Sequence, residues 1–168
     1  MTVMEMVREK AKKLNRKICL TESDDPRNLK AAARLVATGL ARPVLVGIAA
    51  AIEKLARDNA IDLKGVEIVD IFTWPKFSQY VEMVVELRKN KGMTSDLARK
   101  WLMDTCAFSA AMVCAGDAHG YVSGGGNPKG YNHNTGSKIK PALQLFKTAS
   151  GIRIASAYFI MQLQNREL

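Results

Sequence analysis

The chain has 168 residues, of which 48% are hydrophobic, so it can bury one core and a single domain is the first expectation. Its 25 basic and 16 acidic residues give a formal charge of +9, which favours anionic ligands or nucleic acid as partners. The sequence has no run of 18 apolar residues and no apolar segment near Met1 of the kind found in secretion signals. We therefore expect no membrane span and a cytoplasmic location.

Helix-like and strand-like patterns alternate along the chain. Residues 2–15 place apolar side chains at helical spacing and charges on the other face. Ile18-Cys19-Leu20 is typical of a short buried strand. Pro26 after an aspartate is typical of a helix start, and Gly39 of its end. Further helices are expected at 52–58, 76–90, 94–103 and 107–114, and strands near 17–21, 43–47, 67–70, 120–123 and 152–161.

This alternation predicts an α/β fold, with a mainly parallel sheet and helices on both faces in three αβα layers. Ligands of such sheets collect at the carboxyl ends of the strands. The glycines at 124–126 directly follow an expected strand, which would place them at such an end. They lack the G-x-G-x-x-G spacing and the later acidic residue of a dinucleotide site, so we do not expect a dinucleotide cofactor.

The chain has three cysteines, Cys19, Cys106 and Cys114, an odd number without a C-x-x-C pair. Each lies in an apolar stretch, so buried, reduced thiols are expected. Together with His119 and His133 they do not form a zinc-binding pattern, and no metal site is predicted.

Two basic segments carry the functional prediction. Residues 86–93 have the sequence ELRKNKGM and end in a glycine where an apolar helix pattern stops. This segment is either a solvated helix end, with cations against the negative pole of the helix dipole, or an anion site. The second segment, residues 133–148, has the sequence HNTGSKIKPALQLFKT.

Together these segments resemble the phosphate acetyl/butyryl transferases, the phosphotransacetylase family, whose members carry ELRKxKGM-like and HxTGDxLRPALQxxKT-like stretches. The resemblance extends in order over nearly the whole chain. It includes Leu20-Thr21-Glu22-Ser23 and the helix start after it, Val44-Leu45-Val46-Gly47, and Thr148-Ala149-Ser150-Gly151. It implies transfer of an acetyl or other short acyl group between phosphate and coenzyme A. Both are substrates, and no bound cofactor is implied.

The resemblance also suggests site residues. Arg88 matches a family arginine associated with substrate binding, and a planar guanidinium suits a pair of phosphate oxygens. Lys140 stands where the family has arginine, and Ser137 where it has aspartate. His133, Thr135 and Gly136 resemble the family's loop before its next helix, which Thr135 would cap. A loop histidine without a ligand is the simpler interpretation of His133.

Family members are about twice as long as this chain. The resemblance therefore implies a fold that is incomplete relative to the full family fold, with residues 1–150 as a first α/β region and 151–168 as the truncated start of a second domain. The family's serine–arginine pair and the aspartate proposed to deprotonate the thiol have no counterparts here. The catalytic residues are accordingly unknown and expected in the missing half. We expect this chain alone to be catalytically very poor, with a homo-oligomer or a complementing chain covering an apolar face at 152–160.

Two alternatives remain. One is a non-catalytic module for anion binding or assembly that kept the family fold and lost the chemistry. The other is a basic nucleic-acid-binding protein. The positive charge is spread along the chain and no aromatic-studded basic stripe is evident, which argues against nucleic acid.

Overall fold

The computed structural model of the protein describes residues 2–124, 135–146, 148, 150–152, 154, 162–163 and 166–167. The helices are α1 (Val3–Leu14), α2 (Pro26–Thr38), α3 (Ala49–Asp58), α4 (Phe77–Arg88), the short 3₁₀ helix η1 (Lys89–Lys91), α5 (Ser95–Trp101), α6 (Thr105–Cys114) and α7 (Thr135–Leu145). The strands are β1 (Lys17–Leu20), β2 (Arg42–Gly47), β3 (Glu67–Asp70), β4 (Gly120–Val122), β5 (Gln162–Leu163) and β6 (Arg166–Glu167).

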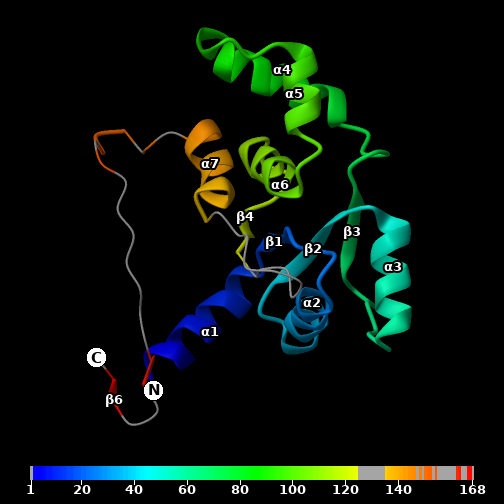
Figure 1. Cartoon of the computed structure of the whole chain (residues 1–168). Helices are drawn as coiled ribbons and strands as arrows, with labels where there is room; N and C mark the ends of the chain where they lie inside the picture. The colour runs from blue at the N-terminus through cyan, green and yellow to red at the C-terminus, as the bar shows by residue number, and fades with distance from the viewer. Residues whose placement is uncertain are drawn as a thin grey trace.

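Strands β1 to β4 form one parallel sheet in the order β3-β2-β1-β4, which confirms the predicted α/β class (Figure 1). Cys19 pairs with Val44 of β2 on one side and with Tyr121 of β4 on the other. The first four predicted strands are all present within two residues of the expected bounds. Strands β5 and β6 form a separate antiparallel pair.

The fifth predicted strand, at 152–161, falls mostly outside the described residues. Its described members, Ile152 and Ile154, are not part of a strand. No described helix has both the length and the apolar character needed to cross a membrane.

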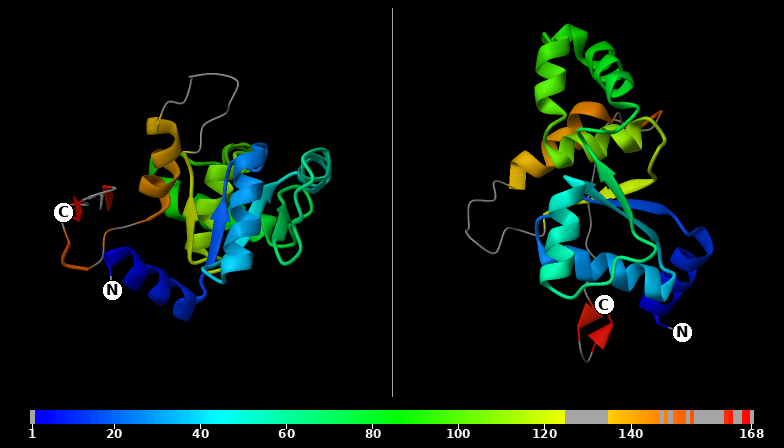
Figure 2. Two further views of the ribbon diagram at one scale, coloured as in Figure 1. Left: turned by 90° about the horizontal axis from the view of Figure 1, so that it is seen from below. Right: turned by 90° about the vertical axis from the view of Figure 1, so that its right-hand side faces the viewer.

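Side chains alternate across the sheet and build a core on each face. Cys19, Val44, Val46 and Val69 belong to one apolar cluster, which also holds residues of α4, α5, α6 and α7. Leu20 and Leu45, with residues of α2 and α3, make the other. Because successive residues of a strand point to opposite faces, these short apolar strands are buried on both sides, as parallel strands usually are. Each cluster lies between the sheet and one of the two helix layers seen in Figure 2.

Local signals explain several helix ends. Asp25 accepts a hydrogen bond from the Arg27 amide as the cap of α2, and Gly39 ends that helix with φ +66°. Thr94 caps α5 by accepting a hydrogen bond from the Leu97 amide. The long helix expected at 76–90 ends at Arg88 and passes through the 3₁₀ turn η1 to Gly92, which has φ +74°.

Candidate functional site

The strand order creates one topological switch point, between β1 and β4. From β1 the chain proceeds to β2 and β3 on one side, and it returns to β4 on the other. In open α/β sheets ligands bind outside the carboxyl ends of the strands at such a point. The residues that follow the two strands are Thr21 and Glu22 after β1, and Ser123 and Gly124 after β4.

Glu22 joins these two strand ends. One of its carboxylate oxygens, Oε1, accepts hydrogen bonds from the Ser123 hydroxyl at 2.9 Å and from the Gly124 amide at 2.8 Å. The other, Oε2, accepts from the Thr21 hydroxyl at 2.9 Å. The Thr21 amide donates to the Val122 carbonyl at 3.3 Å, so main-chain and side-chain bonds tie the ends of β1 and β4 together.

The turn from β1 into α2 is held by a second carboxylate. Asp25 is buried and accepts from both Nε and Nη2 of Arg27, at 2.9 and 2.6 Å to Oδ2. The hydrogen bonds from Arg27 hold the pKa of Asp25 below its usual value, against the opposing effect of burial. Asn28 donates to the Glu22 carbonyl at 2.9 Å. The residues after β1 are therefore fixed by α2 as well as by β4.

Arg88 lies at the last residue of α4 and reaches α7. Its Nη1 donates to the carbonyl of Gln144 at 3.2 Å, in the last turn of α7. This is where a cation stabilises a helix, since the last carbonyls have no partner in their own helix. Arg88 Nε and Gln144 Oε1 are both buried and have no hydrogen-bond partner in the described part of the chain.

Lys140 lies on α7, one turn before Gln144, and is exposed. The two basic segments are thus brought together by packing of α4 against α7, although Arg88 and Gln144 are 56 residues apart in the sequence. Thr135 and Gly136 form the start of α7, and Thr135 is its first helical residue rather than the capping residue before it. His133 lies outside the described residues.

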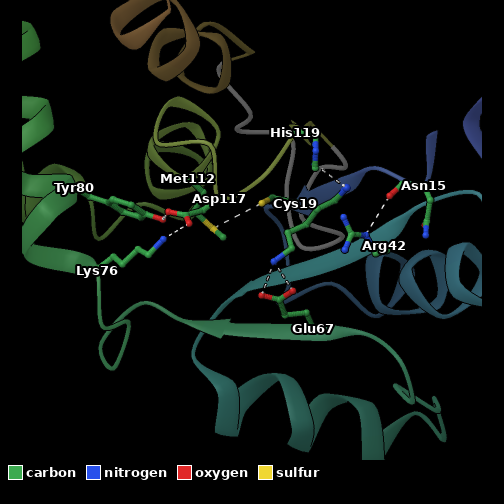
Figure 3. A network of polar contacts seen from close by, with 10 residues as sticks. Asn15, Cys19, Arg42, Glu67, Lys76, Tyr80, Met112, Asp117 and His119 are labelled. Carbon is green, nitrogen blue, oxygen red and sulfur yellow. Dashed lines mark hydrogen bonds and ion pairs between the residues drawn. The ribbon is translucent and has the colours of Figure 1, made fainter.

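A polar network links α4 to the segment that follows α6 (Figure 3). The buried Tyr80 hydroxyl donates to Asp117 Oδ2 at 2.7 Å, and Lys76 forms an ion pair with Oδ1 of the same carboxylate. Partial burial raises the pKa of Asp117, but the hydrogen bonds from Lys76 and Tyr80 and the charges of Lys76 and Lys17 outweigh it. The pKa is therefore below its ordinary value. This network ties the start of α4 to the end of α6.

The three cysteines are free thiols. Cys19 and Cys106 are buried as predicted, whereas Cys114 is only half-buried. Burial raises the pKa of Cys19 to about 12, so its thiol stays protonated beside Met112, with the two sulfurs 3.8 Å apart. In the described ranges no three His, Cys, Asp or Glu side chains come together in a way that could hold a metal ion.

A cleft of about 670 Å³ lies elsewhere, between α1 and α2. Its lining combines cationic and apolar side chains: Arg8, Lys12, Ala31, Arg34, Leu35, Thr38 and Leu40. None of the residues predicted from the two basic segments lines it.

Comparison with known proteins assigns the chain to a family. The family model described as "Phosphate acetyl/butaryl transferase" matches residues 2–168. The chain belongs to the phosphate acetyl/butyryl transferase family. It is 39% identical over 167 residues to the phosphate acetyltransferase of Acetivibrio thermocellus, covering 99% of this chain and 48% of the relative. To the Escherichia coli phosphate acetyltransferase it is 40% identical over 158 residues, covering 92% of this chain and 21% of the relative.

Solved structures agree with this assignment. A phosphotransacetylase from Streptococcus pyogenes superposes with a TM-score of 0.79 at 33% identity, over 90% of this chain and 45% of that one. A phosphotransacetylase from Staphylococcus aureus gives a TM-score of 0.77 at 32% identity, over 89% and 43%. The chain spans half or less of the length of the relatives it matches.

Sequence reasoning assigned no role to Glu22, Ser123 or the Gly124 amide. The available signal was their position, since polar residues directly after two buried parallel strands meet at one edge of the sheet. What the sequence could not provide was the strand order, which makes β1 and β4 neighbours.

Proposed function

We propose that this chain forms the N-terminal α/β part of a phosphate acyltransferase, which transfers an acetyl or other short acyl group between phosphate and coenzyme A. The observation that carries the proposal is the contact between Arg88 of α4 and the last turn of α7. It joins the two segments whose sequences match the family's substrate-binding stretches. Substrate binding by Arg88, His133, Thr135, Gly136 and Lys140, and action in the cytoplasm, belong to the same proposal.

The chemistry explains why cations are needed there. Coenzyme A, phosphate and acetyl phosphate are all anionic, and attack by the coenzyme A thiolate builds negative charge on the carbonyl oxygen. Arg88 supplies a guanidinium on a helix end, with Nε not yet satisfied in the described structure. A phosphate oxygen is a strong acceptor for such a donor. Lys140 adds charge on the neighbouring helix but lacks the fork geometry of arginine.

Arg88→Ala tests the site. The variant should weaken binding of acetyl phosphate or coenzyme A, measured by calorimetry, by about 1.5–3 kcal/mol, because a hydrogen bond to a charged group is lost. Lys89→Ala is the matched control: Lys89 is the next cation, and it pairs with Glu86 at the surface at 2.5 Å. If Arg88→Ala binds as tightly as the unaltered protein, the proposed site is wrong.

A non-catalytic anion-binding module remains the second candidate. Lys140 and Ser137 depart from the family pattern, and Arg88 is engaged with a helix carbonyl. Lys140→Arg separates the two candidates. In an acyltransferase the bidentate guanidinium of the introduced arginine should tighten phosphate binding and raise turnover in the presence of a completing chain. In a pure binding module it should change affinity alone.

We further propose that residues 1–150 form the first α/β region, that 151–168 begin a second domain, and that the thiol base lies in the half absent from this chain. The chain alone should then turn over very slowly, because catalytic groups that act as a unit are lost together. Turnover within tenfold of an ordinary enzyme rate of about 10 s⁻¹, from a monomeric sample, would contradict this.

Exposed apolar side chains support a covering partner, either a second copy or a complementing chain. Ile152 and Ile154, two of the residues expected on the apolar face at 152–160, are 54% and 79% exposed. The other apolar residues expected on this face, Ala155, Tyr158, Phe159 and Ile160, lie outside the described residues. Sedimentation of the purified chain over a range of concentrations tests self-association.

A further inference from the structure

We propose that Glu22 is a positioning residue, whose carboxylate holds the ends of β1 and β4 together and so fixes Ser123 and Gly124 at the topological switch point of the sheet. The two oxygens of this carboxylate accept from Thr21, Ser123 and the Gly124 amide. The effect of Glu22 on substrate binding rests on the proposed function, whereas the contact itself does not.

The hydrogen bond from the Gly124 amide to Glu22 is the most important of these contacts. Gly124 is the second residue after β4 and has φ +110°, a conformation that residues with a side chain rarely adopt. Strand β4 has three residues, and among the described strands it pairs with β1 alone. A charge-assisted bond to the Gly124 amide therefore adds a fixed point directly after a short strand with few ladder bonds.

The same contacts argue against Glu22 as a catalytic base. A base must offer a free lone pair to the proton it removes, within hydrogen-bond reach of the substrate. Both oxygens of Glu22 already accept hydrogen bonds from the protein, and Oε1 accepts two. A carboxylate whose two oxygens are engaged in this way orients the chain instead of exchanging protons with a ligand.

The strand order gives this contact its functional meaning. Strands β1 and β4 meet at the topological switch point, where open α/β sheets bind ligands outside the carboxyl ends of the strands. Glu22 fixes both strand ends there through the hydroxyls of Thr21 and Ser123 and the Gly124 amide. Glu22 thus acts on the substrate through the placement of these strand ends, without touching the substrate.

The contact is tested first, by NMR of the whole chain. The Gly124 amide proton should shift as Glu22 is titrated with acid, and this response should vanish in Glu22→Gln. In Glu22→Ala, hydrogen exchange at Gly124 should be about tenfold faster or more, because a charge-assisted bond is lost. The matched control is Asp24→Ala, which removes a carboxylate from the same loop at an exposed position.

An unchanged Gly124 exchange rate in Glu22→Ala overturns the proposal. Should that variant not fold, Glu22→Gln decides: its weaker neutral acceptor should still speed exchange at Gly124 several-fold, and an unchanged rate again overturns the inference.

A second measurement tests the positioning role, using coenzyme A and acetyl phosphate as probes. Glu22→Ala should lose affinity severalfold, Glu22→Gln should recover most of it, and Asp24→Ala should bind normally. If the unaltered chain binds neither probe, the proposed function fails while the NMR result still stands or falls by itself. Faster exchange at Gly124 with normal affinity would overturn the positioning role alone.

Discussion

Helices α1 and α6 have similar lengths, 12 and 10 residues, and lie at opposite extremes of burial. Every residue of α6 from Cys106 to Met112 is buried, whereas α1 has no buried residue. Helix α6 is apolar all round, which is typical of a helix that is buried on every side. Helix α1 has the stronger amphipathic pattern, yet Val3, Met6, Val7 and Leu14 are exposed.

The difference teaches what an amphipathic pattern does and does not say. It shows that a helix has an apolar face, but not what covers that face. Helix α1 is held together by local bonds: Thr2 and Glu5 form a reciprocal capping box, and Asn15 ends the helix with φ +41°. Helix α6 contributes instead to the packing of the whole layer on the sheet. We therefore expect substitutions in the two helices to have very different effects on stability.

The largest effect is expected for Phe108→Ala. Phe108 of α6 is fully buried, and its ring lies 5.4 Å from the ring of Tyr80 and 6.3 Å from that of Phe77. Truncation should lower the free energy of unfolding by about 3–5 kcal/mol, through lost burial and the cavity left behind. Urea unfolding measures this. Leu14→Ala in α1 is the control, and an equal loss there would remove the contrast between the two helices.

A smaller effect is expected for Asp117→Ala, at the end of the α6 region. The variant leaves the buried Tyr80 hydroxyl without its acceptor and should cost about 1–3 kcal/mol. Adding Tyr80→Phe should restore part of the loss, because an unpaired buried hydroxyl is then removed as well. If the double variant loses as much stability as the two single variants combined, the lost hydrogen bond does not explain the effect of Asp117→Ala.

The same carboxylate predicts a pH dependence. Because the pKa of Asp117 is lowered in the folded protein, its contribution to stability is complete above the ordinary value of 3.8. It declines as the pH falls below that value, and it is lost once the pH is below the folded pKa. The stability difference between the unaltered protein and Asp117→Ala should therefore shrink in acid. Asp25 titrates in the same direction in both proteins and cancels in the difference.

Thr2→Ala should weaken α1 without weakening the domain. Loss of the capping box costs a helix about 1 kcal/mol, and the exchange of the α1 amides should rise accordingly. The midpoint of global unfolding should stay nearly constant, because α1 contributes no buried residue. A clear fall in that midpoint would show that α1 is coupled to the core more strongly than its exposure indicates.

The smallest effect is expected for Val7→Ser, on the exposed apolar face of α1. Val7 is 49% exposed, and surface substitutions usually change stability by less than about 0.5 kcal/mol. If a partner chain covers this face, the same variant should weaken association, which sedimentation would detect. A large loss of stability in a monomeric sample would contradict the expectation.

Much of the fold was predictable because its signals are local. Pro26 and Gly39 mark the ends of α2, and the apolar residues of β1 and β2 mark buried strands. The candidate site was predictable only in part. Arg88 was identified through its motif, but its partner is a main-chain carbonyl of Gln144, and any residue there would offer one. The role of Glu22 depends on β4 lying next to β1, which follows from the topology and not from local spacing.

The central position of β1 has a consequence for how the chain folds. While the protein is being synthesised, β1 can pair with β2 as soon as residues 42–47 are available. Its other edge must wait for β4, which begins beside His119, 102 residues after Lys17. Closing such a long loop is entropically costly and slows folding. We expect β4 to join last, and the open edge of β1 to be the point at which the unfinished chain is most prone to misassociate.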